Sequence, residues 1–101
     1  MKRHIRTLIH ALCLVLVAPV LAGEYAVVVS RATRADKDWQ PVVAALVKKH
    51  EAIVIEHDGE VAAALGSLRA AFPRYTCFVA TPKEATGVYV AQVHQLTRKL
   101  D

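Results

Sequence analysis

Hydrophobic and polar residues follow one another in three similar units, each a short apolar run followed by a longer amphipathic stretch. The apolar runs lie at residues 24–30, 52–56 and 74–80, and they are rich in β-branched and aromatic residues. The run at 24–30 is apolar on both faces, which is typical of a buried strand in a parallel sheet. The pattern therefore predicts three parallel strands that alternate with helices.

The stretches after these runs carry apolar residues at the three-and-four spacing of one helix face. The predicted faces are Trp39, Val42, Val43, Leu46 and Val47, then Val61, Ala64, Leu65, Leu68 and Phe72, and finally Tyr89, Val93, Leu96 and Leu100. Strand-helix units in succession imply right-handed parallel crossovers. We expect an α/β fold, a three-layer sandwich whose short parallel sheet comes from three strand-helix units and forms part of a larger sheet.

Capping signals predict where the first two helices begin and end. Asp36 or Asp38 is expected to cap the first helix, with Pro41 tolerated in its first turn. Asp58 is expected to cap the second helix, and Pro73 to end it.

The third helix has two candidate starts. Thr81 and Glu84 have the spacing of a capping box, with Pro82 at the first helical position. Gly87 makes a start near Thr86 equally compatible with the pattern.

The first two dozen residues differ from the rest and have the pattern of a secretory signal. A basic start is followed by an apolar stretch at residues 8–17 and by Pro19, with short side chains before Gly23. We therefore expect residues 1–22 to be a signal peptide cleaved between Ala22 and Gly23, and residues 23–101 to be an exported α/β domain. Its destination is the periplasm, the cell envelope or the medium.

Two other interpretations of the start fit less well. A spanning helix needs about 20 apolar residues, whereas residues 8–22 are fewer and include His10 and Pro19. A lipid-modified Cys13 would need a small residue before it and a place at the end of the run, but it follows Leu12 in the middle. We expect no stable membrane anchor after cleavage.

Removing the signal changes the charge balance. The chain has 13 Lys and Arg against 9 Asp and Glu, and three of the basic residues but none of the acidic ones lie before Ala22. The remaining segment has a net charge near +1, so its composition favours neither a nucleic-acid partner nor an anionic membrane.

Cysteine usage excludes a disulfide scaffold. Cys13 lies in the predicted signal, so Cys77 remains alone in the exported segment. Cys77 also lies inside a predicted strand, short of its carboxyl end, where packing in the core is a better explanation than a nucleophile.

Ligands of open parallel sheets bind beyond the carboxyl ends of the strands. The loop after the first predicted strand has no glycine, so we expect no nucleotide cofactor. Arg31, Arg34 and Lys83 follow two of these strand ends and are weak candidates for binding a carboxylate or phosphate. The scattered histidines lack the spacing of zinc ligands, and we expect no metal.

His57 beside Asp58 is the nearest approach to an acid/base pair. The alternative, which we favour, makes Asp58 a helix cap and His57 a loop residue. The sequence therefore predicts no catalytic residue within the chain.

Several segments together resemble a known family: the export signal, the strand at 24–30, the helix start at Asp38 and Trp39, and the block at 72–80. The chain is similar to the N-terminal part of secreted gingipain-type, caspase-like cysteine peptidases and their uncharacterised relatives. In that family a histidine and a cysteine at the ends of later strands form the catalytic dyad, and neither motif occurs here.

The resemblance implies a non-catalytic N-terminal portion of a protein that acts in proteolysis, with any peptidase activity supplied by residues after Asp101. The alternative is a cell-envelope binding or interaction module without enzymatic activity. A three-stranded parallel sheet has two open edges, and we expect downstream chain or another subunit to cover them.

Overall fold

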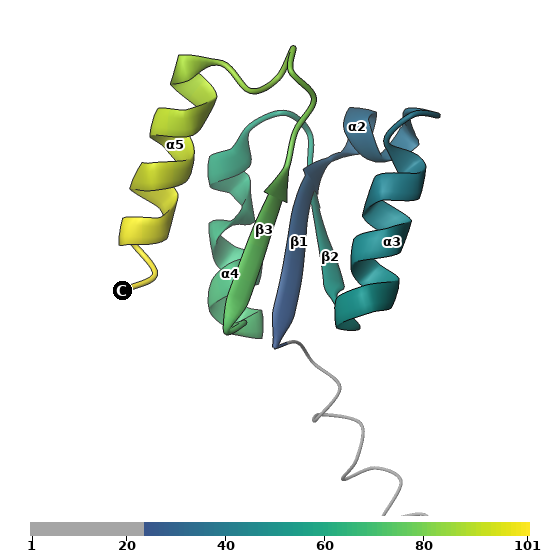
Figure 1. Cartoon of the computed structure of the whole chain (residues 1–101). Helices are drawn as coiled ribbons and strands as arrows, with labels where there is room; N and C mark the ends of the chain where they lie inside the picture. The colour runs from purple at the N-terminus through teal and green to yellow at the C-terminus, as the bar shows by residue number, and fades with distance from the viewer. Residues whose placement is uncertain (1–23) are drawn as a thin grey trace, which may run out of the picture.

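The computed structural model describes residues 24–101, which form a three-stranded parallel sheet with helices on both faces (Figure 1). The strands are β1 (Tyr25–Ser30), β2 (Ile53–His57) and β3 (Tyr75–Val79), in the order β2-β1-β3. The predicted α/β class is confirmed, and each strand begins and ends within one residue of its predicted bounds. The predicted signal peptide and its cleavage site lie outside the described residues.

Five helical segments connect and follow the strands. They are α2 (Arg31–Ala35), α3 (Gln40–His50), the 3-10 helix η2 (Val61–Ala64), α4 (Leu65–Ala71) and α5 (Gly87–Arg98). None of the helices within residues 24–101 combines the length and the apolar composition needed to cross a bilayer. α2 was not predicted, because the residues after the first strand were treated as a loop. It begins at once because the Ser30 side chain accepts a hydrogen bond from the Thr33 N–H at 3.1 Å and caps it.

The two faces of the sheet have separate cores, and β1 contributes to both. On one face α3 packs against β1 and β3 around Val27, Val29, Val43 and Val79. On the other face η2, α4 and α5 pack against β1 and β2. The buried residues of this core are Ala26, Val28, Ile55, Val61, Ala64, Leu68 and Leu96. A central strand covered on both faces has no solvent side, which explains why the predicted run at 24–30 has no polar alternation.

The starts of the first two helices differ from their predicted caps. Trp39 is the N-cap of α3 and makes no side-chain cap bond, while Asp36 Oδ1 accepts from the Asp38 N–H at 2.8 Å in the turn after α2. Asp58 also caps nothing, since Glu60 precedes η2 and Asp58 pairs with Arg31. The unpredicted α2 explains the first difference, because it turns the residues around Asp36 into a link between two helices.

The second helix ends before Pro73 as predicted, but the predicted place of Phe72 in the core is wrong. α4 ends at Ala71, and Phe72 follows in the left-handed region with φ 47° and 81% of its surface exposed. The left-handed turn swings Phe72 away from the core that its helical spacing predicted. Val42 at the first turn of α3 is likewise exposed, because the narrow face of that helix is centred on Val43.

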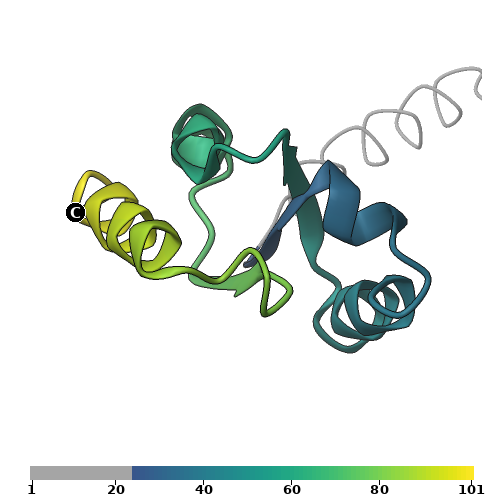
Figure 2. The ribbon, with the colours of Figure 1, turned by 90° about the horizontal axis from the view of Figure 1, so that it is seen from above.

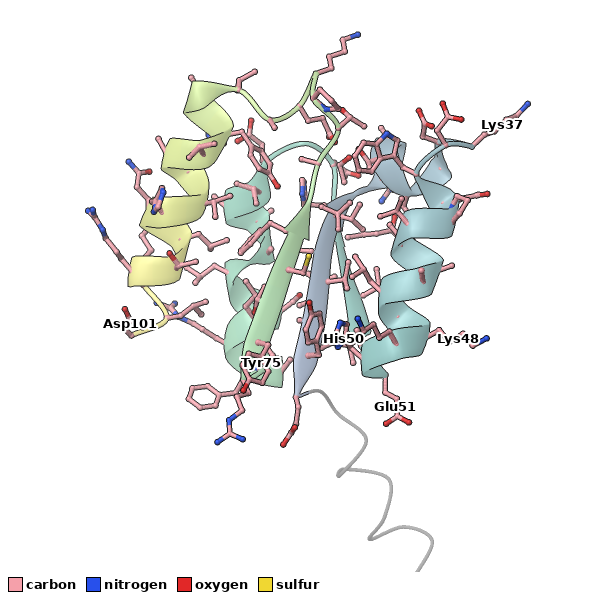
Figure 3. The ribbon with its side chains drawn as sticks, in the orientation of Figure 1. Lys37, Lys48, His50, Glu51, Tyr75 and Asp101 are labelled. Carbon is pink, nitrogen blue, oxygen red and sulfur yellow. The ribbon has the colours of Figure 1, made fainter. Side chains whose placement is uncertain are left out.

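Charge is distributed unevenly between the two ends of the sheet. α3, α4 and α5 run antiparallel to the strands, so their C-terminal ends lie at the amino end of the sheet (Figure 1). Lys37 lies at the opposite, carboxyl end (Figure 3). Basic residues at the amino end are Lys48, Lys49, Arg69, Arg74, Arg98 and Lys99, and acidic ones are Glu24, Glu51 and Asp101. At the carboxyl end the balance is reversed, with basic Arg31, Arg34, Lys37 and Lys83 against acidic Asp36, Asp38, Glu56, Asp58, Glu60 and Glu84.

Candidate functional site at the carboxyl end of the sheet

The candidate site lies where the chain leaves β1 and β3 toward opposite faces of the sheet. β1 leads to α2 and then to α3 on one face, while β3 leads to α5 on the other, as the view from above shows (Figure 2). This divergence between neighbouring strands is where open parallel sheets bind ligands. The side chains that meet there are Ser30, Thr33, His57, Thr81, Glu84 and Tyr89.

Glu84 links the segment after β3 to the segment after β1. Its Oε1 accepts hydrogen bonds from the Thr33 hydroxyl and, at 3.3 Å, from the Thr81 N–H. The Thr81 Oγ1 in turn accepts from the Glu84 N–H at 3.3 Å. These reciprocal bonds have the pattern of the predicted capping box, but they close a separate turn, because α5 begins later with Thr86 as its N-cap.

The position of Glu84 keeps its carboxylate ionised. Burial raises its pKa, but hydrogen bonds from Ser30, Thr33 and the Thr81 backbone, together with nearby His57, outweigh burial and leave the pKa below its usual value. Thr33 is itself 2% exposed and Ser30 equally buried. The charged group is therefore held by two buried hydroxyl residues, and it fixes the two diverging loops to one another.

His57 is the last residue of β2 and is 6% exposed, which corrects its predicted place in a loop. Its Nδ1 accepts from the Gly59 N–H at 3.1 Å, in a turn where Gly59 has φ 118°. A nitrogen that accepts carries no proton, so the neutral ring has its proton on Nε2. This Nε2 is buried without a hydrogen-bond partner among the described residues.

Burial also lowers the pKa of His57, and the opposing effects of Glu84, Asp58 and Glu60 do not reverse it. The Tyr89 hydroxyl at the start of α5 is likewise buried without a partner among the described residues, and burial followed by the charge of Glu84 raises its pKa. The histidine and the tyrosine are therefore both held in their neutral forms around one carboxylate.

The three weak ligand candidates do not share one site. Arg34 donates to Glu56 at 2.5 Å, and Arg31 lies 3.2 Å from Asp58 and 3.8 Å from Glu56, all at the exposed rim. Lys83 lies apart from them on an open hollow of about 410 Å³ that Thr33, Asp36 and Glu84 also line. The two arginines thus pair with acidic side chains, although Arg31 also lines a second open hollow beside Glu84, together with Asp58 and Gly59.

Cys77 lies in the middle of β3 and is half-buried, as its sequence position predicted. It packs against the core cluster of Val27, Val29, Val43 and Val79. His50 ends α3 and His94 lies exposed on α5, so neither approaches His57. Within residues 24–101 no group of three histidine, cysteine, aspartate or glutamate side chains is placed to hold a metal ion.

The contact of Glu84 with the segment after β1, and the nearness of Ser30, Thr33 and Tyr89, were not predicted from the sequence. The only signal was the capping-box spacing of Thr81 and Glu84, and that spacing predicts a local turn rather than a contact with Thr33, 51 positions away. Chemically the cluster is a fixed carboxylate with neutral donors around it. This arrangement suits it to hold loops in place more than to transfer protons.

Comparisons of the chain with protein-family models, with curated proteins and with solved structures gave no match.

Proposed function

We propose that this chain is the exported, non-catalytic N-terminal part of a cysteine-peptidase-like protein that acts in proteolysis. The observation that carries the proposal is the open edge of β3. Among residues 24–101, β3 pairs only with β1, and three of its five residues, the uncharged Thr76, Cys77 and Phe78, are half-buried. An apolar edge without charge or proline is suited to accept another strand.

The position of α5 supports the same proposal. α5 follows the edge strand β3 and packs on the face that already carries α4 (Figure 1). In a doubly wound sheet a helix on this face leads to a strand beside the one that it follows. A fourth strand would then lie next to β3, and its carboxyl end would stand beside the Glu84 cluster.

The role of the Glu84 cluster in this proposal is structural. The hydrogen bond between Thr33 and Glu84 fills the space where the chain leaves β1 and β3 in opposite directions. A catalytic dyad would therefore lie at the carboxyl ends of the added strands and not between β1 and β3. The chain then supplies three strands of the sheet and a wall beside the reacting groups.

An antibody raised against the folded residues 24–101 tests this proposal on protein taken from the cells that make it. The recovered polypeptide should be longer than residues 23–101, start at Gly23, and react with an acyloxymethyl ketone probe for cysteine peptidases. Labelling should disappear after treatment with iodoacetamide and should persist in a Cys77→Ser strain.

A recovered polypeptide no longer than residues 23–101, unlabelled and held in the envelope fraction, would refute the proposal and favour the envelope module instead. Labelling at Cys77 itself, with loss of activity in the Cys77→Ser strain, would also contradict it, because the chain would then be catalytic.

A further inference from the structure

The amino end of the sheet carries exposed aromatic rings together with an excess of positive charge. We call this surface the amino-end face and define it by Phe72, Tyr75 and the basic residues Lys48, Lys49 and Arg74. Phe72 is 81% exposed and Tyr75 is 58% exposed. Figure 3 shows Tyr75, His50 and Lys48 at this same end of the molecule.

Three of the aromatic rings at this end, those of Tyr25, His50 and Tyr75, lie close together. The Tyr25 ring stacks on the His50 ring with centroids 4.0 Å apart, and it lies 6.4 Å from the Tyr75 ring. Phe72 precedes Tyr75 by three residues and projects at the end of α4. Aromatic rings with polar tips beside an exposed phenylalanine are the composition of proteins at the membrane–water interface.

Phe72 also has a left-handed backbone conformation. Its φ of 47° is a conformation that glycine adopts freely and that a bulky side chain adopts only at a cost. A strained phenylalanine that buries almost nothing in its own core does not stabilise the fold. Glu51 ends α3 with the same left-handed backbone, so what distinguishes Phe72 is the exposure of a large apolar ring at the end of its helix.

Charge identifies the chemistry of a contact with this face. Six lysine and arginine side chains lie at the amino end, compared with three acidic ones. Arg74 lies between α4 and β3, so its charge is not explained by a favourable interaction with the dipole of its own helix. The net charge near +1 is therefore an average over two ends of opposite sign. Each basic residue close to an anionic bilayer contributes about 1 kcal/mol of attraction.

We propose that the amino-end face docks on an anionic lipid bilayer, with Phe72 and Tyr75 at the interface and Lys48, Lys49 and Arg74 on the lipid headgroups. A bilayer fits better than an acidic protein, because exposed aromatic rings and neighbouring cations together match the apolar and anionic layers of a membrane interface. The acidic carboxyl end with Glu84 then faces the solution.

The first test uses the full chain and vesicles of phosphatidylcholine, with or without one quarter phosphatidylglycerol, in a sedimentation assay. Residues 1–23 are identical in all variants and cancel from each comparison. Phe72→Gly should lower partitioning into the anionic vesicles by about tenfold. Glu51→Gly is the matched control, because Glu51 also has a left-handed backbone, φ 51°, at a helix end of this face; it should bind at least as well as wild type.

The second test separates the two ends by charge. Lys48→Gln with Lys49→Gln should lower partitioning into anionic vesicles by about tenfold or more and leave partitioning into phosphatidylcholine unchanged. Lys37→Gln with Lys83→Gln removes two cations from the carboxyl end and should have no effect.

Thermal unfolding of each variant is measured alongside, and both glycine variants should unfold at or above the wild-type temperature. Wild-type binding by Phe72→Gly, or equal losses from the two lysine pairs, would overturn the proposal. A wild-type dimer that Phe72→Gly converts to a monomer, with unchanged vesicle binding, would assign the face to a second copy of the chain and overturn it as well. The outcome is independent of the peptidase proposal, since no step uses catalysis.

Discussion

Replacing Glu84 by glutamine tests whether its carboxylate holds the two loops at the carboxyl end together. Glutamine keeps the length and one acceptor oxygen but removes the charge. The acceptor that receives the Thr33 hydroxyl and the Thr81 N–H then forms ordinary hydrogen bonds in place of charge-assisted ones.

The expected loss follows from the number of these bonds. A hydrogen bond to a charged group contributes about 1.5–3 kcal/mol and a neutral one about 0.5–1.5 kcal/mol. Weakening the two bonds that Oε1 accepts, from Thr33 and from the Thr81 N–H, therefore lowers the free energy of unfolding by about 1–2 kcal/mol in this half-buried setting. For a domain of this size that is a fall of about 5–10 °C in the melting temperature.

Circular dichroism melts of the full chain at pH 7 measure this loss, with Glu60→Gln as the exposed control, expected within about 0.5 kcal/mol of wild type. A double-mutant cycle with Thr33→Val should give a coupling energy of about 1 kcal/mol. A change in Glu84→Gln no larger than that of the control, or a coupling near zero, would refute the assignment of Glu84 as the link.

The stability that Glu84 contributes should also depend on pH. Its pKa is lowered in the folded state, so its contribution is complete above about pH 4.5 and is lost as the pH falls through the lowered pKa. Urea titrations of wild type below that pH should therefore converge on those of Glu84→Gln.

Three further predictions concern single positions. Burial lowers the pKa of His57, so below about pH 6.5 the unfolded chain binds a proton more readily than the folded protein does. The free energy of unfolding should therefore fall as the pH drops below about 6.5. Urea titrations at several pH values should show this fall in wild type and not in His57→Gln. Phe72→Gly should raise the free energy of unfolding by about 0.5–1 kcal/mol, because relief of the left-handed strain exceeds the entropy cost of glycine; a lower melting temperature would show that the ring is packed. Leu68→Ala should cost about 2–5 kcal/mol, since Leu68 is fully buried, whereas Phe72→Ala should change stability by less than about 0.5 kcal/mol; equal losses in chemical denaturation would contradict the exposure of Phe72.

The strands were predictable because their signal is local. A central parallel strand is apolar at every position, and the run at 24–30 has that composition whatever the rest of the chain does. The same holds for the buried stripe of α5, where Leu96 lies in the core with Tyr89, Val93 and Leu100 beside it.

The helix ends were less predictable, because several residues compete for each cap. Asp36, Asp38 and Asp58 all have the chemistry of a cap, yet the segment after β1 formed α2 and used Ser30 instead. Phe72 has the spacing of the α4 core face, and only the left-handed residue at the end of the helix turned it outward.

The sequence by itself determined the α/β class, the place of the strands, the lone Cys77 and the near-neutral charge of residues 23–101, since composition and local periodicity are properties of the chain. Only the tertiary structure decided that Glu84 meets Thr33, that His57 is buried, and that the charge divides between the two ends of the sheet. The physical reason is that parallel crossovers bring distant strand ends together at one edge of the sheet and gather the helix ends at the other. No local pattern records which residues become neighbours across that distance.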